Sequence, residues 1–469
     1  MKKILIILMT FLIIASCTKL EDLNKDTKNP TEVPGVTLFS NAQKNLADQI
    51  ASTNVNLNVF KLWAEYWTET TYTDEANYNI INRTISDNAW RVWYRNVLMD
   101  FKEAGIVIAA TEYATSTEEA EAANQLVIND IMMVFAWERM VTLWGNIPYG
   151  AALDIDNIQP VYEDAATIYS NLLTRLETDI AALDENNGSF GGADFIYHGD
   201  VSAWKKFANT LKLKMGTVIK DAGVVSSAMG GAFSSNADNA NFVYLDSPPN
   251  TNPLYVDLVL SGRQDFVATT LITDYMNPLE DPRRPAYFTL APDTNVYLGG
   301  VYGASSPYAL YSHVADDIAT VPTFPCTILS YVEVEFYLAE YYARQDDPAN
   351  AEAHYNAGIT ASFDFWGTEG IADYLANPDV AYSTAYDTWQ ETIATQAWIA
   401  FYNNGYLGWT EWRRLGFPVL PLAADAYVNS IPTRFTYPVF EQTLNGDNYT
   451  AAASAIGGDL LTTKLWFAK

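Results

Sequence analysis

Apolar positions recur at intervals of three and four residues along most of the chain. One stripe contains Ala165, Ile168, Leu172, Leu176, Ile180 and Leu183. A stripe with this spacing buries one face of a helix. A second helix is predicted after Asp200, which can act as its N-cap. Its apolar side would carry Val201, Trp204, Phe207, Ala208 and Leu211. Strand-like alternation is scarce, so the pattern predicts a mainly α protein.

The segment from about Leu329 to Ile359 predicts two helices joined by a tight turn. The first helix would run from about Leu329 to Ala343, the turn is "QDDPAN", and the second helix would continue through Ile359. A helix pair with small residues at the crossing resembles a tetratricopeptide unit. No exact sequence period is visible, so we expect helical hairpins of this kind and not a regular solenoid. Further helices are expected near 120–141, 160–184 and 386–405.

Two long irregular stretches interrupt the helical pattern. Residues 229–281 and 280–325 are rich in Gly, Pro, Asn, Ser and Tyr. Loops of this length in a compact protein are usually functional or disordered. Their aromatic content argues against disorder. We therefore expect tetratricopeptide-like helical hairpins packed with a loop-rich, ligand-binding portion.

The N-terminus has the features of an export signal. Lys2 and Lys3 precede an apolar run that is too short to span a bilayer but fits a secretory signal. The run ends in "IIASC", which resembles the lipobox of bacterial lipoproteins and makes Cys17 the expected lipidation site. The prediction is a signal peptide over 1–16, a lipidated tether over 17–35 and a body over 36–469. The alternative is an ordinary signal peptide with a chance cysteine. The following "TKLED" resembles the tether of surface-exposed lipoproteins in the Bacteroidetes.

The charge of the chain limits the classes of binding partner, and its cysteine content limits disulfide formation. The formal net charge of -29 argues against nucleic acid and anionic membrane surfaces. The acids are spread without a long run, which is typical of a solvated surface. A neutral ligand is compatible with this charge, and a polyanion would need a local cluster such as Arg283 and Arg284. With Cys17 lipidated, Cys326 has no intrachain partner, so we expect no disulfide.

Several segments along the chain form an ordered set of motifs: "NKDTKNPTEVP", "WKKFANTLKLKM", "NPLY", "DPRR", "VEVEFYLAE", "QAWIAFYNNGYLGWTEWRRLGFP", "IPTRFTYPVFEQTLNGDNY" and "TTKLWF". Taken in this order, they resemble the SusD/RagB family of outer-membrane nutrient-binding lipoproteins. The likeness is strongest to the SusD-like branch. It implies an extracellular, lipid-anchored subunit at the outer membrane that partners a SusC-type TonB-dependent transporter. We expect Arg413 to be structural, and Glu333, Glu335 and Glu340 to be solvated or paired with arginines such as Arg344.

The sequence contains few features that would indicate an enzyme. The three histidines, His198, His313 and His354, lack metal-ligand spacing, and no metalloprotease, nucleophile-elbow or phosphate-loop motif occurs. Glu65 and Glu69 are four apart, which on a helix would place them side by side and not across a substrate. We expect a protein that is not an enzyme, with no cofactor and no catalytic metal. A structural calcium ion stays open, because oxygen ligands are plentiful.

Aromatic side chains in polar surroundings point to sugar binding. A sugar ring stacks its C–H face on an aromatic platform while polar groups bind its hydroxyls. In "TTYTDEANYNI" and beyond, we expect exposed, ligand-binding roles for Tyr72, Asp74, Asn77, Tyr78 and Arg83. Rings at Trp63, Tyr66, Trp67, Trp90, Trp93 and Tyr94 have helical spacing and are expected to be mostly core.

Two further stretches could supply stacking platforms. "NVYLGGVYGASSPYALYS" contains Tyr302 and Tyr308, with Gly299, Gly300 and Gly303 allowing close backbone approach. "SFDFWGTEG" contains Trp366 in an expected loop. Each stretch could equally be a loop held in place by its own aromatic residues.

These observations leave functions from three classes. The leading hypothesis is a cell-surface glycan-binding lipoprotein that captures oligosaccharide and delivers it to the transporter. A neutral oligo- or polysaccharide is favoured by charge, with a laminarin-like glucan as one candidate. The alternative is a peptide-binding, RagB-like uptake subunit, which would use mixed pockets instead of flat platforms. A structural adhesin would lack a concave aromatic cleft.

Overall fold

The computed structural model describes residues 33–469, so the predicted signal peptide, Cys17 and most of the tether lie outside the described residues. The first described helix, α2, begins at Gly35, next to the predicted start of the body. Among residues 33–469, no helix combines the length and apolar character needed to cross a bilayer.

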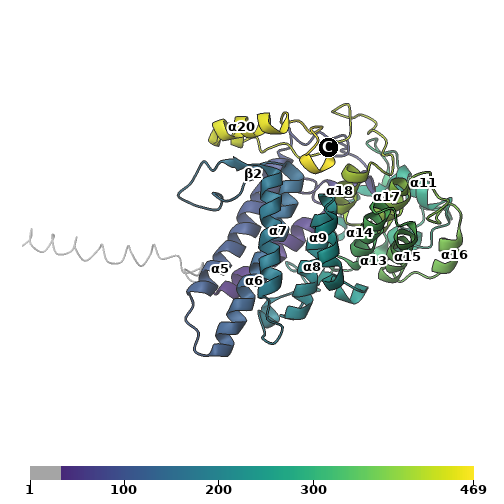
Figure 1. Cartoon of the computed structure of the whole chain (residues 1–469). Helices are drawn as coiled ribbons and strands as arrows, with labels where there is room; N and C mark the ends of the chain where they lie inside the picture. The colour runs from purple at the N-terminus through teal and green to yellow at the C-terminus, as the bar shows by residue number, and fades with distance from the viewer. Residues whose placement is uncertain (1–32) are drawn as a thin grey trace, which may run out of the picture.

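Helices dominate the described chain, as predicted, and most are short (Figure 1). In the first half they are α2 (Gly35–Ala51), α3 (Phe60–Trp63), α4 (Ile85–Arg91), α5 (Met99–Ala110), α6 (Ser116–Trp144), α7 (Ala165–Ala182), α8 (Val201–Val218) and α9 (Ala222–Ala228). Beyond these lie α10 (Pro253–Tyr255), α11 (Thr270–Met276), α12 (Arg284–Tyr287), α13 (Asp316–Ala319), α14 (Tyr331–Arg344), α15 (Pro348–Phe365), α16 (Ile371–Ala376), α17 (Trp389–Ala400), α18 (Gly405–Leu415), α19 (Glu441–Leu444) and α20 (Gly446–Ile456). Two segments, η1 (Val92–Leu98) and η5 (Val256–Leu260), are π-helical.

The helices pack side by side in chain order. Helix α5 packs on α6, α6 on α7, α7 on α8, and α8 on α14 (Figure 1). Side-chain N-caps mark the start of two of these helices, and the cap at Asp200 was predicted from the sequence. The Asp164 side chain caps α7 and the Asp200 side chain caps α8 by accepting from backbone N–H groups. The residues of the two stripes identified in the sequence are buried in the core, except for the partly buried Ile180.

The predicted helical hairpin is present as α14 and α15. Ser330 and Glu333 form a capping box at the start of α14. Gly358 lets the two helices approach closely, since a Cβ there would lie 3.1 Å from Cδ2 of Phe336. The hairpin has its own apolar cluster, which includes Phe336, Tyr355 and Ile393, beside the larger core of the rest of the chain.

The strands form three small antiparallel pairs in the described chain. They are β1 (Trp67–Glu69) with β5 (Phe266–Ala268), β2 (Ile147–Pro148) with β3 (Tyr162–Glu163), and β4 (Ala240–Phe242) with β6 (Cys326–Leu329). The first pair matters for the site, because its register places Glu69 opposite Phe266. Two segments about 200 positions apart in the sequence are thereby joined at the surface.

Candidate functional site

A surface cavity of about 320 Å³ lies at the end of the β1–β5 pair. We call it the Tyr72 cavity; it is lined by Val55, Glu69, Thr71, Tyr72, Glu75, Arg83, Arg263, Asp265 and Phe266. The turn after β1 is held there by the Thr70 N–H and hydroxyl, which donate to Asp265 O and Gln264 O at 2.9 and 2.6 Å. The cavity is therefore built from the polar turn after β1 and the turn before β5.

Tyr72 supplies the exposed ring of this cavity. Its side chain is 72% exposed, which makes it one of the most accessible large residues of the described chain. The prediction that Tyr72 is an exposed aromatic residue in a polar stretch is therefore correct. An accessible ring beside hydrogen-bonding side chains is the arrangement that stacks a sugar face.

Two arginines in the cavity are each paired with a carboxylate. Arg83 Nη1 lies 2.9 Å from Glu75 Oε1, and its Nη2 donates to Asn56 Oδ1 at 3.1 Å. Arg263 Nε donates to Asp265 Oδ2 at 2.5 Å. Pairing fixes the two guanidinium groups while leaving other N–H donors free to contact hydroxyl groups.

A second cavity of about 270 Å³ continues from the first. This Asn54 cavity shares Val55, Arg83, Arg263, Asp265 and Phe266 with the Tyr72 cavity, and adds Thr53, Asn54, Asn56, Asp257 and Ser261. The two cavities together form a groove. The groove carries four carboxyl groups and two arginines, and even with one carboxyl group protonated its surplus charge is negative.

The carboxyl group of Glu69 stands out in the groove wall. Burial, followed by the charge of neighbouring Glu75, raises the pKa of Glu69 to about 9. Glu69 Oε2 accepts a hydrogen bond from the Ala76 N–H at 3.0 Å. Glu69 is therefore protonated near neutral pH, which makes this part of the wall a hydroxyl donor as well as an acceptor.

Several predicted site residues are buried, contrary to expectation. Tyr78 is 1% exposed and packs edge-on against Trp63, with ring centroids 6.3 Å apart. Tyr302 is 5% exposed and faces Tyr78 at 6.2 Å. Tyr78 has a positive φ of 68°, and its ring belongs to the hydrophobic core. The prediction of exposed rings at Tyr78 and Tyr302 is therefore wrong.

Asn77 is also buried and joins three loops. Its Nδ2 donates to Gly303 O at 2.7 Å, and its Oδ1 accepts from the Asp425 N–H at 2.9 Å. Asp74, by contrast, is exposed and lines a neighbouring cavity with Asn79, Asp425 and Tyr427. Asn77 therefore supports the walls of this region, and it also lines this neighbouring cavity.

The glycines near Tyr302 serve packing. A Cβ at Gly299 would lie 2.0 Å from Thr269 O, and one at Gly300 would lie 2.4 Å from Ser306 Oγ. The close backbone approach that these glycines allow is to the protein's own backbone and side chains. Tyr308 is half-buried and stacks on His313 at 3.5 Å.

Trp366 lies in the turn that directly follows α15, as the predicted loop after the hairpin requires. It is half-buried and packs against Tyr287 at 4.9 Å. It lines a separate apolar cavity of about 70 Å³ with Phe324, Phe365 and Phe401. That cavity shares no lining residue with the groove.

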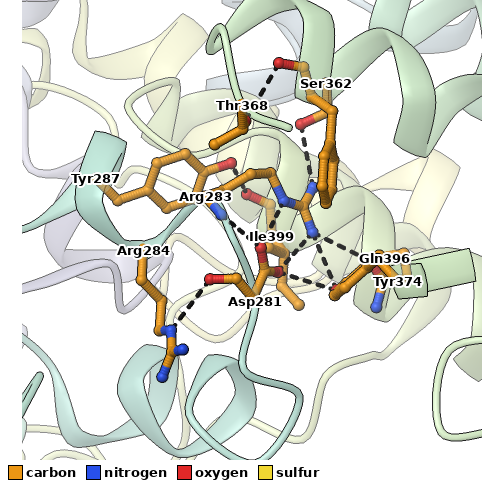
Figure 2. Close-up of polar contacts among 10 residues, drawn as sticks. Asp281, Arg283, Arg284, Tyr287, Ser362, Thr368, Tyr374, Gln396 and Ile399 are labelled. Atoms are coloured by element: carbon orange, nitrogen blue, oxygen red, sulfur yellow. Dashed lines mark hydrogen bonds and ion pairs between the residues drawn. The ribbon is translucent and has the colours of Figure 1, made fainter. Parts of the chain in front are cut away.

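Arg283 cannot serve an anionic ligand, because it is fully buried in a polar network (Figure 2). Its Nη2 lies 2.7 Å from Asp281 Oδ2, and its Nη1 donates to Ser362 Oγ at 3.1 Å. Tyr374 and Gln396 complete the network, which ties the loop before α12 to α15, α16 and α17. The proposed Arg283 and Arg284 anion cluster is thus ruled out.

Other sequence expectations concern residues outside the groove. Arg413 is structural, as predicted, and donates to Thr142 O and Thr433 O at 2.6 and 3.2 Å. Glu340 is buried and pairs with Arg344 and Arg414. Glu65 and Glu69 do not share a helix, because Glu65 has a φ of 56° and Glu69 lies in β1. Among residues 33–469, no cluster of three or more His, Cys, Asp or Glu is placed to hold a metal ion.

The sequence did not identify half of the groove. Arg263, Asp265 and Phe266 come from the irregular stretch 229–281, and Asn54 and Asn56 precede α3. The one available signal was the unusual length of that stretch. Nothing in it indicated a pairing with β1.

Comparisons with known proteins agree with this architecture. Residues 27–438 match a SusD-like family described as starch-binding and associating with the outer membrane. This chain belongs to that family. No curated protein matches the sequence.

Solved structures show the same fold over nearly the whole chain. A SusD homologue from Bacteroides uniformis is 26% identical, with a TM-score of 0.78 over 92% of this chain and 99% of the other. A chitin-binding protein is 24% identical, with a TM-score of 0.79 over 92% and 99%. A chitin-binding SusD homologue from Flavobacterium johnsoniae is 21% identical, with a TM-score of 0.76 over 92% and 98%.

Proposed function

We propose that this chain is a cell-surface, lipid-anchored protein that captures a neutral oligosaccharide in the groove and delivers it to a SusC-type TonB-dependent transporter. The observation that carries the proposal is the exposed Tyr72 ring beside Arg83, Arg263 and Asp265 in one cavity. Family membership and the chitin-binding proteins of the same fold support a glycan ligand. The proposed role is binding without catalysis.

The charge of the groove supports a neutral ligand. Each arginine already has a carboxylate partner, Glu75 or Asp265, and Asp257 adds a further negative charge to the walls. An anionic glycan would meet this surplus charge on entering a partly desolvated groove. A neutral sugar can use the same side chains through hydrogen bonds alone.

A glycan array tests ligand capture. The protein for this experiment lacks the leader 1–16 and carries Cys17→Ala, so that it can be handled without detergent. We expect binding to one or more neutral glycans and weaker binding to their uronate counterparts. Binding to a peptide library with no glycan bound would instead establish the peptide-binding, RagB-like function.

Anchoring and partnership require the cellular protein. Cys17→Ala should shift the full chain from the membrane fraction to the soluble fraction, and retention of the variant in the membrane would contradict lipidation there. Gentle detergent extraction of the unmodified protein should recover a TonB-dependent barrel. Recovery of monomer alone would argue against delivery to a transporter.

A further inference from the structure

A third cavity adjoins the groove on the side away from Tyr72. It measures about 330 Å³ and shares Asn54 and Asp257 with the Asn54 cavity. We call it the π-helix cavity; its other lining residues are Lys44, Asn45, Asp48, Gln49, Ser52, Leu57, Val92, Asn96, Pro249, Thr251, Pro253 and Val256. The shared residues make the three cavities one continuous path over the surface.

Both π-helical segments of residues 33–469 border this cavity. Segment η1 contributes Val92 and Asn96, and segment η5 contributes Val256 and Asp257. π-helices account for well under 1% of residues and occur frequently at functional sites. Two such segments, distant in sequence, converge on one cavity, which is the independent indication that the cavity binds something.

The polar groups of the cavity suit hydroxyl or amide partners. Gln49 is 5% exposed and its Nε2 donates to Leu57 O at 3.0 Å, while its Oε1 has no hydrogen-bond partner among residues 33–469. Asn96 Oδ1 accepts from Arg95 Nε at 2.9 Å, and its Nδ2 has no partner within the same range. One acceptor and one donor are therefore available to a ligand.

The remaining lining makes a charged or purely apolar ligand a poor match. Lys44 and Asp48 pair with each other at 2.5 Å, so neither offers an uncompensated charge. Asp257 Oδ2 accepts from the N–H and hydroxyl of Thr53 at 3.3 and 3.2 Å. Pro249, Pro253 and Val256 provide apolar surface between these groups. Apolar patches flanked by single hydrogen-bonding groups match the C–H faces and hydroxyls of a neutral sugar.

We propose that the π-helix cavity is a second sugar-binding subsite that holds the continuation of the glycan chain bound in the groove. This inference rests on the proposed function and deepens it, because it assigns an extended chain as the ligand. The Tyr72 cavity then binds one part of the chain, and the cavity between η1 and η5 binds sugar units further along.

Two matched substitutions on η5 test the subsite. Val256 lines the cavity and is 40% exposed, whereas Val259 lies on the same segment outside the lining and is 37% exposed. Val256→Arg should obstruct the cavity, and Val259→Arg should leave it open. Both side chains are partly exposed, so both variants should fold.

The readout is calorimetric affinity for oligomers of N-acetylglucosamine and of β-linked glucose, from two to eight units. In the unmodified protein, affinity should rise with chain length and then level off. Val256→Arg should weaken the affinity for the longest oligomers on the order of tenfold, which corresponds to about 1.4 kcal/mol of binding free energy. Its affinity for short oligomers should be unchanged. Val259→Arg should behave like the unmodified protein.

The outcomes separate this inference from the proposed function. Equal affinity for short and long oligomers, or a Val256→Arg variant that keeps the gain from length, would overturn the subsite while leaving glycan capture intact. Absence of binding by either series, together with no neutral glycan bound on the array, would overturn both proposals.

Discussion

Two arginine–carboxylate sites in this protein use the same chemistry for different ends. Arg283 and Asp281 are fully buried, and each of the three guanidinium nitrogens donates to a side chain of the protein (Figure 2). Arg83 with Glu75 and Arg263 with Asp265 face a cavity, with arginine side chains 37% and 57% exposed. Burial, and not residue type, separates the pair that holds the fold from the pairs that can contact a ligand.

The largest expected effect breaks the buried site. Arg283→Met removes the charge that compensates Asp281, which should cost about 3–5 kcal/mol of unfolding free energy. The matched control is Arg263→Met in the exposed pair, which should change stability by about 0–1 kcal/mol. Urea denaturation of both variants measures the difference. Similar losses in the two variants would contradict the distinction drawn from burial.

A second prediction concerns two substitutions of the buried Tyr78. Tyr78→Ala should lower the unfolding free energy by about 3–5 kcal/mol, because it removes a ring packed between Trp63 and Tyr302. Tyr78→Phe should be nearly neutral, since the Tyr78 hydroxyl has no hydrogen-bond partner among residues 33–469. Thermal melts check both. A stable Tyr78→Ala protein would mean that the ring is not part of the core.

The smaller effect concerns pH and the groove wall. Because the pKa of Glu69 rises from 4.5 to about 9 on folding, the folded state keeps a proton that the unfolded state loses between these values. Stability should therefore fall as pH rises across this window. Glu69→Gln should remove that part of the pH dependence. Denaturation at pH 5 and pH 8 measures the unfolding free energy of both proteins. From pH 5 to pH 8, the unmodified protein should lose more stability than Glu69→Gln. An equal change in the two proteins would contradict the prediction.

The regular part of the fold was predictable from local patterns. Stripes at three and four residues located α7, α8 and the α14–α15 hairpin, because each signal lies within one helix. The N-caps Asp200 and Ser330 act within their own first turns. Local chemistry is sufficient where an element is defined by its own sequence.

The site was predictable only in part. Tyr72 and Arg83 do lie together, but the fate of Asn77 depends on partners 226 and 348 positions away. The opposite wall, from Arg263 to Phe266, reaches the site through the β1–β5 pairing. A polar loop shows that some side chains are exposed, while long-range contacts decide which ones.

The most direct test of glycan capture is the affinity of the groove with and without the Tyr72 ring. A neutral oligosaccharide selected on the array is titrated calorimetrically into the unmodified protein, Tyr72→Ala and Tyr427→Ala. Tyr427 is the matched control, because it is 59% exposed but lines the neighbouring Asp74 cavity. Tyr72→Ala should lose about 0.5–1.5 kcal/mol of binding free energy, or about 2- to 13-fold in affinity. Its melting temperature should be unchanged. Tyr427→Ala should bind normally. Unaltered affinity in Tyr72→Ala would contradict the account.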